Sequence, residues 1–388
     1  MKKILFVDDE KRILKSLRRL FYKTDYNCFF ASSGKEALKI LKEYEINLII
    51  TDIRMPKMDG FELLKKVKKH YPKVTRVALS GYTDKDAIME AIEANLIKLY
   101  LYKPWKNEEL KEMVYKTFML EDVLNSKRIF EFINDLDSLP TVPVLFKEIN
   151  HLIEKKADVK KITKKIEKDQ SVASKILHVA NSAYYNAKTG SISKAIMYIG
   201  LLNVKNIVIA NAVFDNQASD SVEMLWKHAN ITNKMAGYIY KKLLLKKIPN
   251  NFSSAGLLHD IGRVVLMTFA EDENEKINIL MNKTPIDFDS RLNYEKKLIN
   301  VTHQKIGAYL LNWWEIPLPI VEAALYHHDP LNEMVINKEL VSVIYLANIC
   351  SWRLLKPEDN RLSIDKEVLE FLKIPEKKFY EKIDEFEI

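Results

Sequence analysis

The chain has 388 residues, 47% of them hydrophobic and 29% charged, which excludes a largely disordered protein and, at roughly 150 residues per domain, predicts two or three domains. Its formal charge of +8 is carried by lysines interleaved with acidic residues along the predicted helices, so we expect a solvated surface and not a nucleic-acid-binding face. No apolar run approaches the roughly 18 residues that span a bilayer, no signal peptide is recognisable, and Cys28 and Cys350 lack disulfide or metal-ligand spacing, so we expect a cytoplasmic protein without membrane insertion.

Strand and helix patterns alternate over residues 1–120. Short apolar runs typical of buried parallel strands occupy 3–7, 28–31, 48–51, 74–79 and 98–102. Between them lie segments with one apolar face, such as the segment that carries Leu14, Leu17 and Phe21. This alternation predicts an α/β doubly wound fold with a five-stranded parallel sheet, in which ligands bind at the carboxyl ends of the strands.

Helical periodicity continues beyond Leu110 to the C terminus, with no further clear strand pattern. Pro140 and Pro143 interrupt it, because proline lacks an amide donor and restricts the residue before it. We therefore predict four parts: an α/β domain over 1–120, a helical linker over 121–137, an all-α domain over 138–352 and a C-terminal helical extension over 353–388.

Charged and hydroxyl side chains stand at the predicted strand ends. Asp8 and Asp9 follow the first strand, Asp52 ends the third, Ser80 ends the fourth and Lys103 ends the fifth. Crowded carboxylates need a cation, and hard oxygen ligands favour magnesium, which together with a lysine can neutralise a transferring phosphoryl group. The set predicts a site that forms an acyl phosphate, although each residue taken singly is also an ordinary turn or helix-cap residue.

Residues 1 to about 120 resemble the receiver domain of two-component response regulators. The resemblance rests on four motifs: Val7-Asp8-Asp9-Glu10, Thr51-Asp52-Ile53-Arg54-Met55-Pro56, Met58-Asp59-Gly60 and Lys103-Pro104-Trp105. It implies a phosphorelay, in which a sensor histidine kinase or a phosphotransfer protein is the phosphoryl donor.

The resemblance also implies a role for each strand-end residue. Asp52 matches the phosphoacceptor, and Asp8 and Asp9 match the acidic pair that binds magnesium together with it. Three further residues match the hydroxyl that moves to the phosphoryl oxygen, the charge partner and the aromatic switch: Ser80, Lys103 and Tyr100.

The helical part carries a second set of candidate ligands. It comprises five of the eight histidines and one aspartate: His228, His259, Asp260, His303, His327 and His328. Neutral imidazoles and a carboxylate suit iron, manganese, nickel or zinc, and such metals activate water in phosphohydrolases. The alternative interpretation is that these side chains form hydrogen bonds within the core or cap helices, and the sequence leaves both open.

Residues 138 to about 350 resemble the HDOD family, a relative of the HD-type phosphohydrolases. The motifs that carry this resemblance are Leu139-Pro-Thr-Val-Pro143, Asp169-Gln-Ser-Val-Ala-Ser-Lys-Ile-Leu177, Ala180-Asn-Ser-Ala-Tyr184, Ala195-Ile-Met-Tyr-Ile-Gly200, Gly256-Leu-Leu-His-Asp-Ile-Gly262 and His327-His-Asp-Pro330. The family implies a helical bundle with mainly regulatory roles. We therefore expect a response regulator whose output domain contacts an unidentified downstream protein or nucleotide ligand, and a homodimer remains open.

A receiver-controlled metal phosphohydrolase acting on cyclic di-GMP or another nucleotide is the alternative, because the receiver motifs also look like those attached to HD-GYP proteins. Three departures from that pattern argue against hydrolysis. No Gly-Tyr-Pro follows His328, Asn348 stands where HD hydrolases place their last aspartate ligand, and Met224 stands where a bridging glutamate can occur.

Overall fold

The computed structural model describes residues 1–81, 91, 96–124, 144–155, 157–180, 187, 189–214, 220–246, 248–249, 252, 254–272, 288–314, 316–357 and 363–386. The chain divides into two compact units, Met1–Tyr115 and Lys116–Ile388. Most of the linker predicted over 121–137 lies outside the described residues.

A five-stranded parallel sheet forms the centre of the first unit. Its strands are β1 (Lys3–Val7), β2 (Asn27–Ala31), β3 (Leu48–Asp52), β4 (Thr75–Ser80) and β5 (Leu99–Tyr102). They are arranged in the order β2-β1-β3-β4-β5, and every neighbouring pair is parallel. The predicted doubly wound α/β fold is confirmed, and all five carboxyl ends meet at one edge of the sheet.

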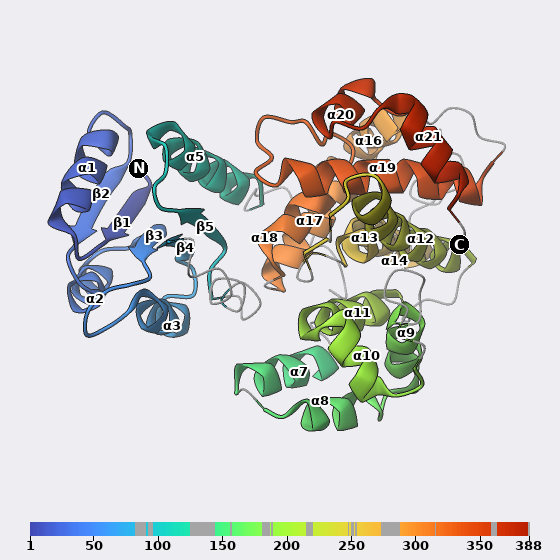
Figure 1. Cartoon of the computed structure of the whole chain (residues 1–388), viewed down its shortest axis with the longest axis horizontal. Helices are drawn as coiled ribbons and strands as arrows, with labels where there is room; N and C mark the ends of the chain where they lie inside the picture. Colours follow the sequence, from blue (N-terminus) through green and yellow to red (C-terminus); the bar gives the residue numbers. More distant parts are fainter. Residues whose placement is uncertain are drawn as a thin grey trace. The chain divides into compact units, whose positions relative to one another are not determined.

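Helices cover both faces of this sheet. They are α1 (Lys11–Phe21), α2 (Gly34–Glu43), α3 (Gly60–His70) and α5 (Asn107–Leu124). Figure 1 shows α1 and α5 along one face and α2 and α3 along the other. The side chains of Ser33 and Asp59 cap α2 and α3 by accepting hydrogen bonds from the backbone N–H groups of Glu36 and Glu62.

The turn between β3 and α3 requires a glycine. The Gly60 amide donates to the carbonyl of Ile53 at 2.9 Å, and a Cβ atom at Gly60 would lie only 2.2 Å from the carbonyl oxygen of Asp52. Gly60→Ala is therefore expected to push this turn away from Asp52 and to lower the free energy of unfolding by about 1–3 kcal/mol. Urea unfolding measures this, with Gly190→Ala as the control because a Cβ there meets no atom within 4 Å. Equal stability of the two variants would contradict the prediction.

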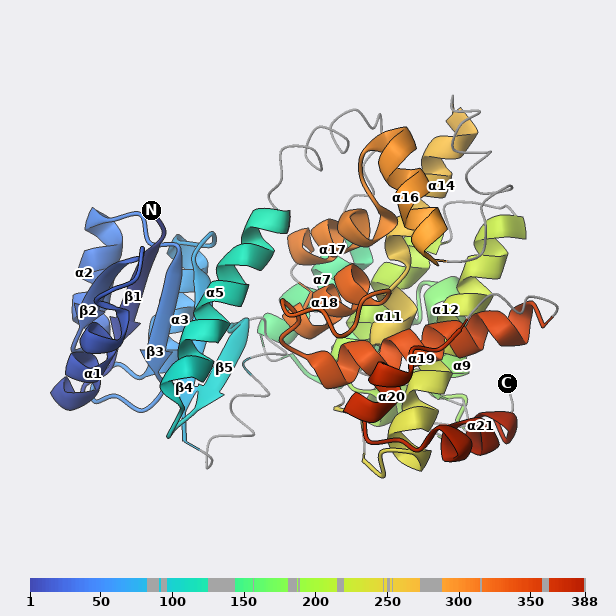
Figure 2. The same cartoon turned by 90° about the horizontal axis from the view of Figure 1, so that it is seen from above.

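The second unit is helical in its described parts, which confirms the predicted all-α region. Its helices are α7 (Val144–Glu154), α8 (Val159–Ile166), α9 (Gln170–Ala180), α10 (Ile192–Ile199), α11 (Leu201–Phe214), α12 (Asp220–Lys242), α13 (Ala255–Leu258), α14 (Ile261–Asp272), α16 (Phe288–Ile299), α17 (His303–Trp313), α18 (Leu318–Tyr326), α19 (Lys338–Leu355), α20 (Lys366–Phe371) and α21 (Glu376–Asp384). The long helix α12 packs against α19, and α17 packs against both α14 and α18 (Figure 2).

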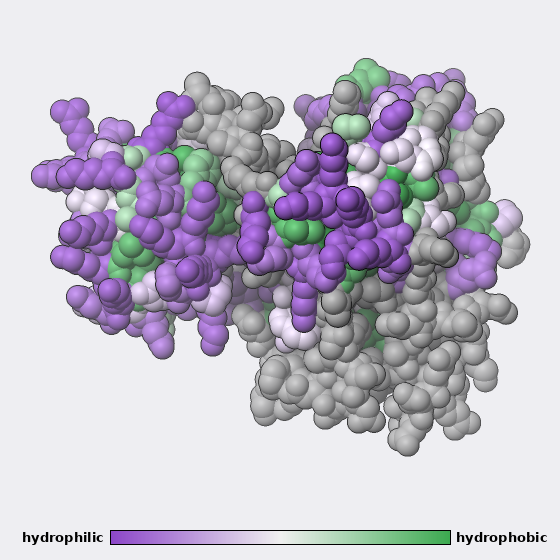
Figure 3. Space-filling view, turned by 90° about the horizontal axis from the view of Figure 1, so that it is seen from below, coloured by the Kyte–Doolittle hydropathy of each residue, from purple (hydrophilic) through white to green (hydrophobic). Residues whose placement is uncertain are grey.

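The surface of the first unit is largely hydrophilic on the face drawn in Figure 3, as expected for a solvated surface. On the face drawn in Figure 3, hydrophilic side chains cover most of the coloured surface of the first unit, at the left of the view. Within the described parts of the chain, no single helix is long and apolar enough to cross a membrane. Among the described helices, one pair that is bent by 114°, Ile192–Ile199 with Asn203–Asn211, is together long and apolar enough to meet the length and composition expected of a membrane-spanning segment.

Candidate functional sites

The first candidate site lies at the carboxyl edge of the sheet. Asp8 and Asp9 follow β1, Asp52 ends β3, and the three residues offer carboxylate oxygens that lie within 4.8 Å of one another. Lys103 follows β5 and joins two of them, with Nζ 2.8 Å from Asp8 Oδ2 and 2.9 Å from Asp52 Oδ2. The parallel register thus brings together four residues from three strand ends, as the sequence predicted.

Burial and the neighbouring charges shift the pKa values of the groups in this carboxylate cluster. Asp8 is fully buried, and burial raises the pKa of its carboxyl although the Lys103 ammonium acts in the opposite direction. Burial alone would lower the pKa of Lys103, but hydrogen bonds and charge interactions with Asp8 and Asp52 raise it. One ammonium beside three carboxylates leaves an excess of negative charge, so the oxygen donors fit a hard divalent cation such as magnesium.

Ser80 ends β4 and Tyr100 lies on the adjacent strand β5. The Lys103 amide donates to the Ser80 carbonyl at 2.7 Å, which places the two residues side by side, and the Ser80 hydroxyl donates to the carbonyl of Gly81 at 2.9 Å. Tyr100 is half-buried on β5, and its ring meets that of Tyr102 edge-on at 5.1 Å. Their roles as the hydroxyl partner and the aromatic switch stay predictions.

Asp9 differs from the other two aspartates because its side chain is exposed. We expect Asp9→Ala to weaken magnesium binding by about tenfold, since a coordinating carboxylate is lost while Asp52 and Lys103 remain. Calorimetric titration with magnesium measures this change. Asp25→Ala is the matched control, because Asp25 is exposed and precedes β2 at the opposite edge of the sheet. An unchanged dissociation constant in Asp9→Ala would exclude the proposed coordination.

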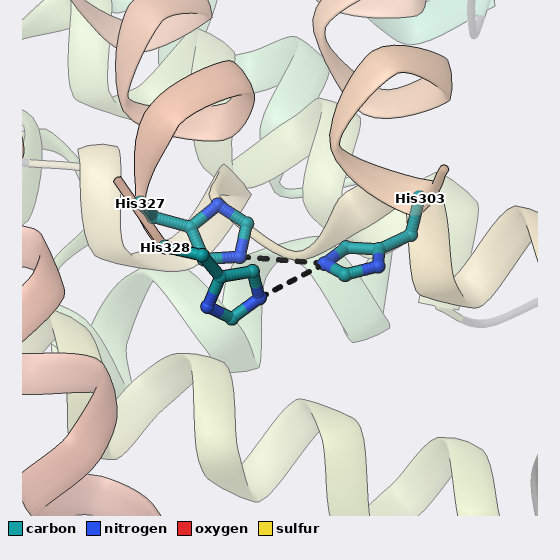
Figure 4. A group of neighbouring side chains, drawn as sticks. All are labelled: His303, His327 and His328. Atoms are coloured by element: carbon teal, nitrogen blue, oxygen red, sulfur yellow. Dashed lines mark hydrogen bonds between the residues drawn. The ribbon is translucent and has the colours of Figure 1, made fainter. Parts of the chain in front are cut away.

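The second candidate site is built from four helical segments of the second unit. His228 lies on α12, His259 and Asp260 lie between α13 and α14, His303 begins α17, and His327 and His328 follow α18. The structure brings all six predicted residues together, and two ligand sets form: His228, His259 and Asp260, and His303, His327 and His328. In Figure 4, the side chains of His327 and His328 point toward that of His303.

Two glycines allow the helices to approach at this site. A Cβ atom at Gly256 would lie 2.5 Å from the Asn233 Cα of α12. A Cβ atom at Gly262 would lie 1.9 Å from the His303 carbonyl oxygen at the start of α17. The Gly-Leu-Leu-His-Asp-Ile-Gly segment therefore holds His259 and Asp260 against both neighbouring helices, because only glycine fits at either end of it.

Hydrogen bonds to the Nδ1 atoms of His259, His303 and His327 determine which nitrogen of each neutral ring carries the proton. The Nδ1 atom of His259 lies 2.8 Å from the Gly256 carbonyl, and that of His327 lies 2.9 Å from the Ala324 carbonyl. His303 Nδ1 lies 2.8 Å from the buried Glu295 carboxylate. Carbonyl and carboxylate oxygens only accept, so Nδ1 carries the proton in each neutral ring and Nε2 is left as an acceptor.

His228 also carries its proton on Nδ1. The Ser351 hydroxyl donates to the His228 carbonyl at 3.1 Å and therefore accepts from His228 Nδ1, which lies 2.9 Å away. Acceptor nitrogens consequently face one another, with Nε2 of His228 3.3 Å from Nε2 of His259, and Nε2 of His303 3.4 Å from Nε2 of His327. Lone pairs directed at a common point suit a bound cation, not a hydrogen-bonded core.

Asp260 belongs to the first ligand set and also approaches the second set. Its Oδ1 is 3.4 Å from His303 Nε2 and 3.3 Å from His327 Nε2, whereas its Oδ2 is 3.7 Å from His228 Nε2. Oδ1 is buried and makes no hydrogen bond within the described structure. An orphaned carboxylate oxygen beside acceptor nitrogens fits a metal centre in which Asp260 is shared.

Protonation states agree with metal binding. Burial lowers the pKa of His259 to about 4 and also lowers the pKa of His228 and His327, so these imidazoles are neutral, as metal ligands must be. Burial opposes ionisation of Asp260, but the Arg263 guanidinium, with Nη1 2.9 Å from Oδ2, holds the pKa of that carboxyl well below its usual range.

Sequence analysis did not identify Glu295, Arg263 or Ser351, which surround this cluster. Arg263 directly follows the glycine-bounded segment and could have been included on that ground. Glu295 precedes His303 by eight residues without a motif, and only the tertiary structure reveals the contact between their side chains. Buried carboxylate partners of this kind orient histidine ligands and make them more basic.

Comparisons with known proteins assign each of the two units to a known domain family. The family model of the response regulator receiver domain matches residues 4–115, and that of the HDOD domain matches residues 139–330. Sporulation initiation phosphotransferase F of Bacillus subtilis is 32% identical over 119 residues, covering 31% of this chain and 95% of that protein. Hydrogenase transcriptional regulatory protein HoxA of Cupriavidus necator is 35% identical over 111 residues, covering 29% of this chain and 23% of HoxA.

A solved structure shares the fold of the helical unit. The putative phosphohydrolase from Shewanella amazonensis is 20% identical, covers 68% of this chain and 95% of that chain, and gives a TM-score of 0.51. The chain spans about a quarter of the length of HoxA and of the regulatory protein AtoC from Escherichia coli.

The fold, the site at the strand ends and the comparisons together define this protein as a response regulator. The chain belongs to the response regulator receiver family and carries an HDOD domain after its receiver.

Proposed function

We propose that this chain is a phosphorylation-controlled regulator in which a sensor histidine kinase or a phosphotransfer protein delivers a phosphoryl group to Asp52. The HDOD domain then changes its interaction with a downstream protein or ligand. The observation that carries the proposal is the position of Lys103 Nζ, 2.8 Å from Asp8 and 2.9 Å from Asp52, beside a third carboxylate at the same sheet edge.

The chemistry follows from the side chains present. An Asp52 carboxylate oxygen attacks the donor's phosphorus atom, and the bond from phosphorus to the donor breaks, which leaves an acyl phosphate on Asp52. Magnesium, held by Asp8, Asp9 and Asp52, would neutralise charge on the phosphoryl oxygens. The Lys103 ammonium would supply a fixed positive charge, and the Ser80 hydroxyl would turn from the Gly81 carbonyl to donate to a phosphoryl oxygen.

The test is the mass of the intact chain after incubation with acetyl phosphate and magnesium. One phosphoryl group should be added to the wild-type chain and none to Asp52→Asn, because an amide does not accept phosphate as a carboxylate does. An equal mass increase in both proteins would refute Asp52 as the acceptor.

We also infer that the HDOD domain binds divalent metal. The inward-facing acceptor nitrogens and the orphaned Asp260 oxygen support this second role, and iron, manganese, nickel and zinc are the candidate metals. Asp260 with His228 and His259 would hold one ion, and His303, His327 and His328 would hold a second ion.

Hydrolysis of cyclic di-GMP by this centre is the competing proposal. It has less support because Met224 precedes His228 by one turn of α12, while the neighbouring Glu223 is paired with Lys227 at 2.7 Å on the exposed side. Asn348 also replaces a carboxylate on α19. A regulatory metal centre is therefore the interpretation that we prefer.

A further inference from the structure

Helix α5 continues from the first unit into the second. It runs from Asn107 to Leu124, and the boundary between the units falls between Tyr115 and Lys116. Its sequence contains neither proline nor glycine, which are common causes of sharp kinks in helices. An unbroken helix is a stiff element, so a movement of α5 within the receiver is expected to reach its last turns.

Lys116 binds a loop of the second unit. Its Nζ atom donates a hydrogen bond to the Val335 carbonyl at 3.3 Å, and both residues belong to the second unit. Val335 is buried in the α18–α19 loop, residues 327–337, which connects these two helices. The part of α5 that lies beyond the receiver therefore holds this loop at one point.

Glu322 on α18 holds the same loop at a second point. Its buried carboxylate accepts hydrogen bonds from the Ile336 amide at 2.8 Å, the Asn337 amide at 3.0 Å and Asn337 Nδ2 at 2.6 Å. Burial raises the pKa of Glu322, whereas these hydrogen bonds and the Lys116 ammonium act in the opposite direction. Withdrawing Lys116 would remove a favourable charge from a buried carboxylate, so the position of α5 affects how tightly the loop is held.

The other end of the loop carries two members of the second ligand set. His327 and His328 directly follow α18, and their side chains point toward His303 (Figure 4), with Nε2 of His328 3.2 Å from Nε2 of His303. Within the loop, the Asn332 side chain donates to the Asp329 carboxylate at 2.7 Å. A hydrogen-bonded loop transmits a shift at its far end to the two imidazoles, because its parts move together.

We propose that the α18–α19 loop couples the receiver to the second ligand set. Phosphorylation shifts α5, the hold of Lys116 and Glu322 on the loop changes, and the affinity of the second ligand set for metal changes with it. Coupling between two sites is reciprocal, so metal at this set also alters the affinity of the receiver for a phosphoryl mimic. The inference rests on the proposed function, in both its parts: phosphorylation of Asp52 and metal binding by the HDOD domain.

Two substitutions in the full-length chain interrupt this route. Lys116→Met keeps the length of the side chain and removes its charge, and Glu322→Gln keeps the shape and replaces an acceptor with a donor. Lys111→Met is the control for the first, because Lys111 is an exposed lysine of α5 within the first unit. Glu339→Gln is the control for the second, because Glu339 lies in the first turn of α19 and pairs with Lys246 at 2.6 Å.

The experiment measures two affinities in each protein. The chain is stripped with a chelator and titrated with zinc at constant magnesium, with and without beryllofluoride. The reciprocal titration with beryllofluoride is made with and without zinc.

Coupling should be present in the wild type and in both controls. Beryllofluoride should change one zinc dissociation constant on the order of fivefold, and zinc should change the beryllofluoride affinity by the same factor. In Lys116→Met and Glu322→Gln, both ratios should approach unity although each protein still binds both ligands. Loss of stability alone would not remove the coupling while leaving the two binding reactions in place.

The remaining outcomes separate this inference from the proposed function. A wild type that binds no zinc, or no beryllofluoride, refutes the corresponding part of the proposed function and this inference with it. A wild type that binds the two ligands independently overturns this inference alone, and so does equal coupling in the wild type and Lys116→Met. If Glu322→Gln does not fold, Lys116→Met decides, because its side chain is only half-buried.

Discussion

Replacing Lys103 with alanine is expected to slow phosphorylation of Asp52 by acetyl phosphate on the order of a hundredfold, the usual cost of removing one preorganised charge partner from a reaction site. The ammonium joins Asp8 and Asp52 at 2.8 and 2.9 Å, so its loss leaves two carboxylates without their shared cation. The rate is measured from the mass of the intact chain over time at saturating magnesium.

Lys106→Ala provides the control for this variant. Lys106 is exposed and lies 3.8 Å from Glu109, so its removal also deletes one positive charge but leaves the carboxylate cluster intact. We expect the control to be phosphorylated at the wild-type rate. A Lys103→Ala variant that reacts as fast as Lys106→Ala would show that the lysine contributes only to stability.

The double substitution His259→Ala/Asp260→Ala is expected to abolish metal binding at the first ligand set and to weaken the second. Asp260 approaches both sets, and His259 Nε2 faces His228 Nε2 at 3.3 Å. Metal at a hundred times its dissociation constant should stabilise the wild-type domain by about 2.7 kcal/mol through mass action. Thermal unfolding with and without zinc, together with metal quantification, measures both effects.

The same pair of proteins tests the hydrolase alternative. We expect metal-loaded wild type not to hydrolyse cyclic di-GMP at a useful rate, because efficient hydrolysis requires metal charge, water and substrate in one reactive geometry. Robust turnover by the wild type, absent from the double variant, would overturn the regulatory interpretation. Equal metal content and equal stabilisation in the two proteins would instead refute the metal centre.

The receiver site was predictable from sequence because a parallel sheet leaves little freedom in where strand ends lie. Once the apolar runs were assigned as strands, Asp8, Asp52 and Lys103 had to meet at one edge. The fourth strand ends at Ser80, as predicted, whereas β5 ends at Tyr102, so Lys103 follows the strand that it was expected to end. The period of alternation predicts strands better than it predicts their last residue.

For the site in the helical unit, the sequence predicted which residues are candidate ligands but not how they are arranged. Histidines and an aspartate identify candidate ligands, but no periodicity shows that Asp260 lies between two sets or that Glu295 supports His303. Those contacts depend on how helices pack, and close approach at Gly262 brings Asp260 to the start of α17.

Hydrogen exchange measured by mass spectrometry on the full-length chain tests the central claim most directly. Beryllofluoride with magnesium mimics the phosphorylated state, and exchange is compared in its presence and absence for the wild type and Asp52→Asn. Phosphorylation-controlled regulation predicts altered exchange both in the receiver and in peptides of the HDOD domain, such as those covering α17 and α18, with neither change in Asp52→Asn. Protection confined to the receiver of the wild type, with the HDOD domain unaltered, would contradict the account.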